Sequence, residues 1–172
     1  MTEVFLGRLV KAFGIRGEVK LHPSDDFWPG VLASKRLFLQ AETAGKSRRR
    51  PITFARSRPH GNSYIVRIDG VDDRDRAEGM VGGELFIEED EIDVELPDKS
   101  MPFQIIGSTV KDENGVVLGK VTSVVFSPAH DVYEVTGRES TFLLPVVPEF
   151  VISHDGRKHE LVIRIQPGLI DD

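Results

Sequence analysis

Short runs of Val, Ile, Leu and Phe, separated by Gly, Pro and Asn, are the feature that most constrains the fold of this chain. Runs of this kind, bounded by turn residues, are typical of β-strands. The pairs Asn114-Gly115 and Asp155-Gly156 predict turns, and the first of them suits a type I′ hairpin. We expect strands over residues 4–10, 17–22, 35–40, 52–56, 63–69, 83–88, 109–112, 116–126, 132–136, 141–145 and 160–165. The sequence therefore predicts an all-β protein.

Only one segment carries clear helix signals. Asp72 suits the N-cap of a short helix, and Asp73 and Asp75 are favourably placed near the positive end of its dipole. The pair Gly82-Gly83 ends the segment. We therefore expect a single short helix from about residue 72 to residue 82.

The segment EEDEIDVELPDKSM, residues 88–101, is acidic, poor in apolar residues and followed by Pro102. Such composition is typical of an interdomain connector. The chain is therefore expected to divide into a domain over residues 1–90, an acidic linker over 91–101 and a domain over 102–172. Each half has too few strands for two packed sheets but enough for a small β-barrel, which removes its own sheet edges.

The charge is distributed unevenly along the chain. Residues 1–68 hold 13 Lys and Arg against 5 Asp and Glu, whereas residues 69–98 hold 2 against 13. One interpretation is a basic face that binds a polyanion on a protein that otherwise stays acidic. The other is that the two segments neutralise each other within one domain. Composition alone leaves both open.

No catalytic or metal-binding motif is recognisable. The chain has no Cys, which excludes disulfides, thiolate nucleophiles and cysteine metal sites. Its five His residues lack metal-ligand spacing. Ser127, His130 and Asp131 are too close in sequence for a catalytic triad, and no GxSxG elbow is present. The sequence therefore predicts a protein without catalytic residues, metal or cofactor.

The N-terminus has no signal-peptide hydrophobic core, and no window approaches the roughly 18 consecutive apolar residues of a membrane helix. We therefore expect a cytoplasmic protein with no membrane partner.

The opening segment GRLVKAFGIRGEVKL, residues 7–21, predicts a basic loop with an aromatic residue at its tip. Such a loop could stack on RNA and hold its phosphates; equally, it could be an ordinary hairpin whose aromatic folds inward. A second basic run, KSRRR at residues 46–50, is expected in a surface loop that could extend the same face. The candidate RNA- or ribosome-binding residues are Arg8, Lys11, Phe13, Gly14, Arg16, Gly17, Lys20, Arg48, Arg49 and Arg50.

Three stretches, taken together and in this order, resemble the family of the bacterial ribosome maturation factor RimM, also called 16S ribosomal RNA processing protein. The first is GRLVKAFGIRGEVK. The second is RIDGVDDRDRAEGMVGGELFI at residues 67–87, and the third is IIGSTVKDENGVVLGKVTSVV with the later LLPVVPEFV and QPGLID. The resemblance covers nearly the whole chain. It implies a six-stranded N-terminal barrel followed by a PRC-barrel domain.

The resemblance also implies a function without catalysis. The family assists assembly of the head of the immature small ribosomal subunit and maturation of 16S rRNA, with small-subunit ribosomal protein nineteen as a partner. We expect a monomer whose basic N-terminal face contacts RNA and whose acidic linker and C-terminal barrel suit a basic ribosomal protein. An RNA-processing or RNA-modifying enzyme that uses the basic loop to bind its substrate is the alternative.

The family usually carries a Tyr-Tyr pair, associated with partner binding, just before the start of its PRC domain. Here that region holds Met101, Pro102, Phe103 and Gln104, with Phe103 as its only aromatic residue. These four residues are the candidate site for the ribosomal protein.

Overall fold

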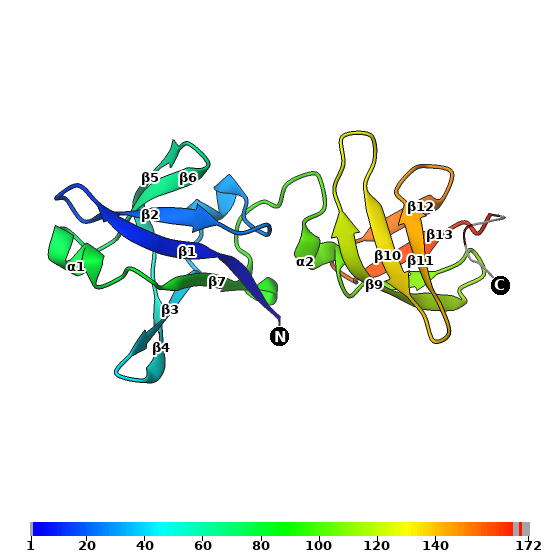
Figure 1. The fold of residues 1–172 in the computed structure, drawn as a ribbon, viewed down its shortest axis with the longest axis horizontal. Helices are drawn as coiled ribbons and strands as arrows, with labels where there is room; N and C mark the ends of the chain where they lie inside the picture. Colours follow the sequence, from blue (N-terminus) through cyan, green and yellow to red (C-terminus); the bar gives the residue numbers. More distant parts are fainter. Residues whose placement is uncertain (1, 167–168, 170–172) are drawn as a thin grey trace. The chain divides into compact units, whose positions relative to one another are not determined.

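The chain folds into two units made almost entirely of β-strands. The computed structural model describes residues 2–166 and 169, and the units are Met1–Asp98 and Lys99–Asp172 (Figure 1). We call them the N-terminal unit and the C-terminal unit. The predicted all-β, two-domain fold is confirmed.

The N-terminal unit is one seven-stranded sheet, in the order β4-β3-β7-β1-β2-β6-β5. All its neighbouring strands are antiparallel. The strands are β1 (Glu3–Phe13), β2 (Glu18–Pro23), β3 (Phe38–Thr43), β4 (Lys46–Pro51), β5 (Phe54–His60), β6 (Ser63–Ile68) and β7 (Glu84–Glu88). Two 3-10 helices, η1 (Pro29–Ala33) and η2 (Glu89–Glu91), and one α-helix, α1 (Arg74–Glu78), complete the unit.

The core of this unit follows from alternation along the strands. In β2, Val19 and Leu21 are buried while Glu18 and Lys20 are only half-buried, because successive strand residues point to opposite faces. Burial of a Leu or Ile side chain stabilises a fold by about 1.5–3 kcal/mol. The fully buried large side chains here are Leu6, Leu9, Leu21, Leu37, Leu39, Ile65, Ile68, Leu85 and Ile87.

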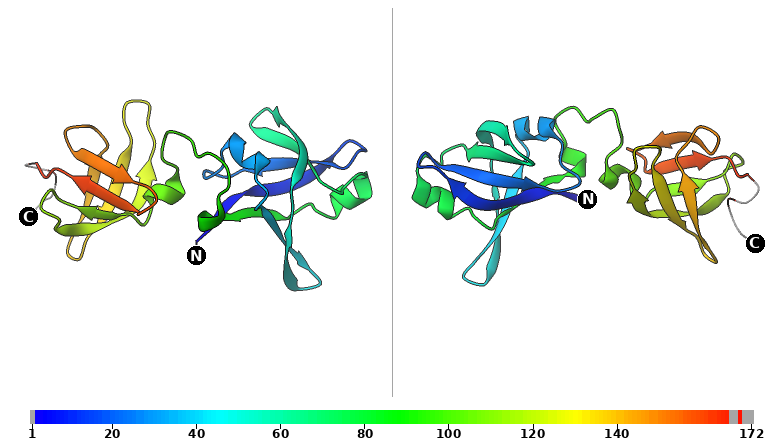
Figure 2. Two further views of the ribbon diagram at one scale, coloured as in Figure 1. Left: turned by 180° about the vertical axis from the view of Figure 1, so that it is seen from behind. Right: turned by 45° about the horizontal axis from the view of Figure 1, so that its top comes forward.

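The expected surface loop at residues 46–50 is wrong, because this run lies in β4. β4 pairs with β3 through a turn at Ala44 and Gly45, whose φ angles of 54° and 76° match the two positive values of a type I′ turn. All six residues of β4 are exposed, so no hydrophobic alternation marked it as a strand. The sheet therefore has seven strands rather than six. The β3–β4 hairpin projects from the sheet in every view of Figures 1 and 2.

The predicted helix is present but shorter than expected. α1 begins after Asp73, whose side chain accepts a hydrogen bond of 2.8 Å from the backbone N–H of Arg76. Asp73 is therefore the N-cap, one residue later than the predicted Asp72. The helix ends at Gly79.

The acidic segment after β7 is attached to the N-terminal unit. The Asp93 carboxylate accepts hydrogen bonds from the Ser34 hydroxyl and from the backbone N–H of Lys35. The indole N–H of Trp28 donates to the carbonyl oxygen of Glu95 at 3.0 Å. These bonds involve residues within the range expected to be a linker, and Lys99 and Ser100 contact Asp131 and His154 of the C-terminal unit, so a connector is proposed only for residues 96–98.

The C-terminal unit is a six-stranded sheet in the order β11-β10-β9-β8-β13-β12, in which only β13 and β8 pair in parallel. Its strands are β8 (Thr109–Lys111), β9 (Val117–Val125), β10 (Val132–Thr136), β11 (Thr141–Pro145), β12 (Val151–Asp155) and β13 (Glu160–Ile163), preceded by helix α2 (Pro102–Ile105). Its core gathers side chains from α2 and five of these strands: Ile105, Val110, Val121, Tyr133, Val135, Phe142, Leu144, Leu161, Ile163 and also Leu169.

Three details of this unit differ from the predictions. α2 and β12 were not predicted. The hairpin at Asn114-Gly115 joins β8 to β9 as expected, but only Gly115 has a positive φ, of 83°, so the turn is not type I′. Instead, the Asp112 carboxylate accepts hydrogen bonds from the backbone N–H groups of Asn114 and Val116, both at 2.9 Å. That local bonding fixes the turn without a second left-handed residue.

Candidate nucleic-acid interface

The predicted basic loop is the connection between β1 and β2, residues 14–17. Gly14 and Gly17 have φ angles of 69° and 88°, in the left-handed region that favours glycine. A Cβ atom at Gly17 would lie 2.3 Å from the carbonyl oxygen of Val71. Only glycine fits there, because the loop lies directly against the backbone that follows β6.

Helix α1 also holds this loop. The guanidinium of Arg74 donates to the carbonyl oxygen of Gly14 at 2.8 Å and also pairs with Glu78 at 3.0 Å. The loop belongs to the stretch GRLVKAFGIRGEVK and the helix to the stretch at residues 67–87. The first two stretches that carry the family resemblance are therefore in contact. The loop is braced in a defined position.

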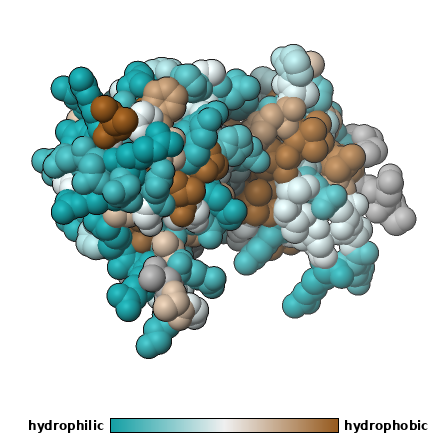
Figure 3. Space-filling model, turned by 60° about the vertical axis from the view of Figure 1, so that its left-hand side comes forward, coloured by the Kyte–Doolittle hydropathy of each residue, from teal (hydrophilic) through white to brown (hydrophobic). Residues whose placement is uncertain are grey.

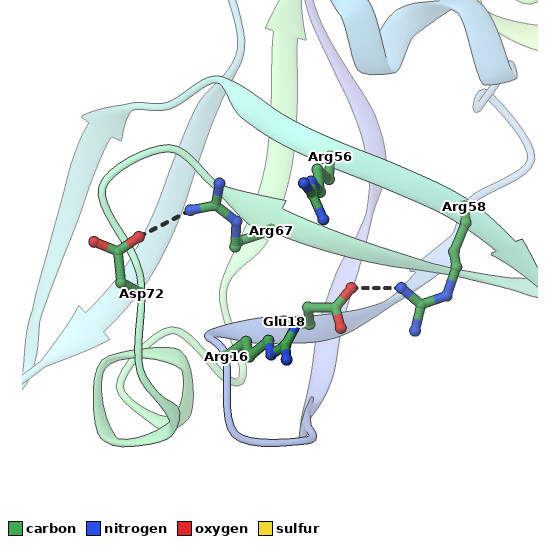
Figure 4. Close-up of a pocket in the computed structure, with 6 residues that line it drawn as sticks. All are labelled: Arg16, Glu18, Arg56, Arg58, Arg67 and Asp72. Atoms are coloured by element: carbon green, nitrogen blue, oxygen red, sulfur yellow. Dashed lines mark hydrogen bonds and ion pairs between the residues drawn. The ribbon is translucent and has the colours of Figure 1, made fainter.

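Beside the loop lies an open groove of about 460 Å³ rich in arginine (Figure 4). We call it the arginine groove. Arg58 pairs with Glu18 at 2.6 Å and Arg67 pairs with Asp72 at 2.9 Å. The guanidinium groups of Arg16 and Arg56 make no ion pair with another described residue. The lining residues are Arg16, Glu18, Arg56, Arg58, Arg67 and Asp72.

Strand register places like charges directly opposite each other on this side of the sheet. Lys11 of β1 faces Lys20 of β2, and Arg67 of β6 faces Arg56 of β5. Directly opposed like charges destabilise a sheet, so these pairs leave a surface suited to an anion. We define the cationic face as Lys11 and Lys20 together with the arginine groove. It carries six cationic side chains against two carboxylates.

Phe13 is not a free aromatic at the loop tip. Its half-buried ring makes an edge contact with the ring of His60, with centroids 5.4 Å apart. The guanidinium carbon of Arg58 lies 5.6 Å from the Phe13 ring centroid. The exposed apolar side chain at the tip is Ile15, at 79%. Of the two alternatives from the sequence, a hairpin whose aromatic residue folds inward describes Phe13 better than an exposed stacking residue.

The second basic run lies elsewhere on the N-terminal unit. Arg48, Arg49 and Arg50 line a different groove, with Met80 among its other residues, and share no residue with the arginine groove. Arg49 is paired with Glu3. Figure 1 shows β4 and β5 in separate hairpins that project to opposite sides. The second basic run thus lines a groove separate from the arginine groove.

Arg8 is the remaining basic residue predicted from the first segment. Its guanidinium lies 3.4 Å from the Glu84 carboxylate on the neighbouring strand β7. It is therefore neutralised locally, unlike Lys11 and Lys20.

Three of the four arginines of the groove were not predicted from the sequence. Arg56 and Arg58 alternate along β5, and Arg67 lies on β6, which pairs with both β2 and β5. The alternating spacing of Arg56 and Arg58 was a usable signal, since residues i and i+2 of a strand share a face. The order of strands, which the sequence does not state, brings them beside Arg16.

The candidate protein-binding residues of the C-terminal unit surround the start of α2. The backbone N–H of Met101 donates to the Gln104 side-chain oxygen at 2.8 Å, and Pro102 occupies the first turn, where its missing N–H is tolerated. Phe103 is half-buried. Gln104 also packs closely against Gly156, so this residue is partly committed to structure.

His154, on β12, is a half-buried titratable group close to the same region. Its Nδ1 lies 3.2 Å from the Ser100 hydroxyl, while its buried Nε2 has no hydrogen-bond partner among the described residues. Burial lowers the pKa of His154 below its ordinary value, because the charged imidazolium is poorly solvated there.

The C-terminal unit also exposes hydrophobic side chains (Figure 3). Val125 and Leu143 are 61% and 62% exposed. Register places Val125 opposite Val132, and Val132 opposite Pro145, which lies two residues from Leu143. These four residues form an apolar patch across β9, β10 and β11. Sequence analysis did not identify it.

Neither a metal site nor a membrane span is found in the described part of the chain. No group of three or more His, Asp or Glu side chains within residues 2–166 and 169 could hold a metal ion. None of the helices there has the length and apolar character needed to cross a bilayer.

The two β units and the cationic face define a two-domain β protein whose N-terminal unit carries a positively charged surface. Two family descriptions match it: RimM N-terminal domain over residues 4–92, and RimM PRC barrel domain over residues 102–169. The chain belongs to the RimM family.

Proteins named Ribosome maturation factor RimM are similar to this chain along almost its whole length. That of Prosthecochloris aestuarii is 33% identical over 158 residues, covering 92% of each chain. That of Thermosipho africanus is 31% identical over 169 residues, covering 97% of this chain and 93% of its own. A crystal structure described as a putative 16S ribosomal RNA processing protein RimM from Pseudomonas aeruginosa is 27% identical, covers 96% of this chain and 98% of its own, and has a TM-score of 0.44.

Proposed function

We propose that this protein is a non-catalytic assembly factor in the cytoplasm that binds the head of the immature small ribosomal subunit and promotes 16S rRNA processing. Membership of the RimM family supports a role in ribosome maturation. A protein that acts only by binding promotes assembly by favouring one conformer of its target. A preference of about 1.4 kcal/mol shifts the two populations tenfold.

The cationic face is the observation that carries the RNA-binding part of this proposal. Lys11 and Lys20 stand directly opposite each other with no ion pair to another described residue. Such a pair weakens the sheet and strengthens attraction to a polyanion. RNA phosphates are the polyanion that a ribosome precursor offers. Binding to RNA would remove the repulsion.

The C-terminal unit is proposed to bind a protein, with small-subunit ribosomal protein nineteen as its partner. The apolar patch of Val125, Val132, Leu143 and Pro145 supports a protein partner, since exposed apolar patches often mark interaction sites. The region of Met101 to Gln104, implied by the family resemblance, remains a proposed part of that site. We propose that the factor itself acts as a monomer.

The first experiment measures binding to immature small subunits by cosedimentation over a range of salt concentrations. Lys11→Gln combined with Lys20→Gln keeps the side-chain lengths similar and removes both charges. We expect the double variant to have unchanged or slightly higher thermal stability and to bind more weakly. The slope of log affinity against log salt concentration should become shallower by about 0.7–0.9 for each phosphate that the variant no longer neutralises. Lys158→Gln, an exposed lysine of the C-terminal unit, is the matched control. Equal binding by all three proteins would exclude the cationic face.

The second experiment measures capture of purified small-subunit ribosomal protein nineteen. Leu143→Ser removes an exposed apolar side chain from the patch, and Val116→Ser removes one that is 55% exposed outside it. We expect the first change to weaken capture and the second to leave it unaltered. Equal capture by both variants would place the protein site elsewhere.

A further inference from the structure

Two of the four arginines in the groove are held in place by carboxylates, and two are not. Glu18 and Asp72 bind the guanidinium groups of Arg58 and Arg67, as the dashed lines in Figure 4 show. Arg16 and Arg56 line the same groove and make no such pair with a described residue. Four cations against two anions leave the groove two positive charges in excess. The groove therefore attracts the phosphodiester groups of an RNA strand, each of which carries one negative charge.

The ring pair of Phe13 and His60 adjoins this groove. Arg58 belongs to both features, because its guanidinium pairs with Glu18 in the groove and its Cζ atom lies 5.6 Å from the Phe13 ring centroid. His60 is exposed at the end of β5, and its ring meets that of Phe13 at an interplanar angle of 65°. An aromatic surface and an anion site therefore lie side by side.

We infer that this combined surface binds one unpaired nucleotide of an RNA strand. The phosphate enters the arginine groove, where Arg16 and Arg56 contact it, and the base stacks on the exposed ring of His60. Phe13 supports that ring from behind. The inference rests on the proposed function and adds single-stranded RNA as the substrate class of the cationic face.

The combination favours a single strand over a duplex for a physical reason. Within a duplex the flat faces of the bases are stacked on one another, so an aromatic side chain has no face to contact. Phosphate contacts alone would serve a duplex equally well. Proteins that hold single strands combine a cationic groove with aromatic rings on which bases stack, and both elements occur here.

The test uses the full chain and fluorescence anisotropy. Three labelled RNAs about 10 nucleotides long are compared: a strand that cannot pair with itself, the same strand annealed to its complement, and a strand of abasic nucleotides. We expect the first to bind more tightly than the other two. Thermal melting of each protein variant shows whether it is folded.

Two substitutions separate the base contact from the phosphate contact. His60→Ala removes the exposed ring, and we expect it to weaken binding of the single strand by about 5- to 150-fold without altering the salt dependence. Arg56→Gln is expected to make the salt dependence shallower by about 0.7 and to preserve the preference for the single strand. His130→Ala and Lys158→Gln, both exposed in the C-terminal unit, are the matched controls and are expected to bind as the unaltered protein does.

Duplex or abasic RNA that binds as tightly as the single strand would overturn the inference, as would a His60→Ala variant of unaltered affinity. The proposed function survives that result if the unaltered protein still cosediments with immature subunits and the lysine variants weaken this binding. Failure of the unaltered protein to cosediment would instead refute the proposed function.

Discussion

Gly17 is expected to be the residue of the β1–β2 loop least tolerant of substitution. Gly17→Ala imposes two separate costs. The first is a left-handed backbone with φ of 88°, which costs a residue with a Cβ about 1–2 kcal/mol. The second is steric, because the new Cβ would lie 2.3 Å from the Val71 carbonyl oxygen, so the two backbones must separate. Forced overpacking of this kind costs about 1–3 kcal/mol more.

Gly14 is a control within the same loop. It also has a positive φ, of 69°, but nothing lies within 4 Å of a Cβ added there. Gly14→Ala therefore carries only the conformational cost. We expect the free energy of unfolding to fall by about 1 kcal/mol for Gly14→Ala and by about 3 kcal/mol for Gly17→Ala.

Chemical denaturation of the full chain, followed by circular dichroism, measures both values. The slope of unfolding free energy against denaturant must be unchanged for the comparison to report stability alone. A domain of this size loses about 4–8 °C in melting temperature for each kcal/mol, so the variants should also differ clearly in a thermal melt. Equal destabilisation by the two substitutions would refute the argument that the loop abuts the Val71 backbone.

Three further predictions concern other parts of the fold. Ala44→Asn should stabilise the β3–β4 hairpin by about 0.5–1 kcal/mol in denaturant titrations, because Asn accepts a left-handed φ more readily than Ala, and a fall in stability would contradict the turn assignment. The C-terminal unit should lose stability as pH falls below 6.5, the ordinary pKa of histidine, because the unfolded chain then binds a proton that half-buried His154 in the folded chain does not. His154→Gln should flatten this profile in melts at different pH values. Limited proteolysis should first cut residues 96–98, between the Trp28–Glu95 hydrogen bond and the start of the C-terminal unit at Lys99. Ser34→Ala should extend the susceptible segment toward residue 91, and a first cut inside a strand would contradict this.

Sequence reasoning succeeded where local chemistry decides structure. Val19 and Leu21 alternate with polar residues, so the buried face of β2 follows from its pattern alone. Asp73 caps α1 within a residue of the expected position. β4 was missed because all six of its residues are exposed, and only pairing with β3 makes it a strand.

The arginine groove was only partly predictable for a related reason. Arg16 was identified from the basic loop, whereas Arg56 and Arg67 lie far along the chain and reach the groove through strand pairing. The role of Phe13 likewise depends on a distant residue, His60, against which its ring packs. Neither contact leaves a trace in local composition.

One interpretation left open by the sequence was that acidic and basic residues neutralise each other within one domain. This neutralisation is incomplete, and the cations that it leaves unpaired belong to the cationic face. Arg8 is neutralised by Glu84, and Arg67 by Asp72, from the acidic segment after β6. Ion pairs as exposed as these contribute little stability. Their larger effect is to determine where positive charge remains. In the N-terminal unit they leave Lys11 and Lys20, with Arg16 and Arg56, as cations on one side of the sheet. A chain with a net charge of −6 can thus attract a polyanion at this surface although its total charge is negative.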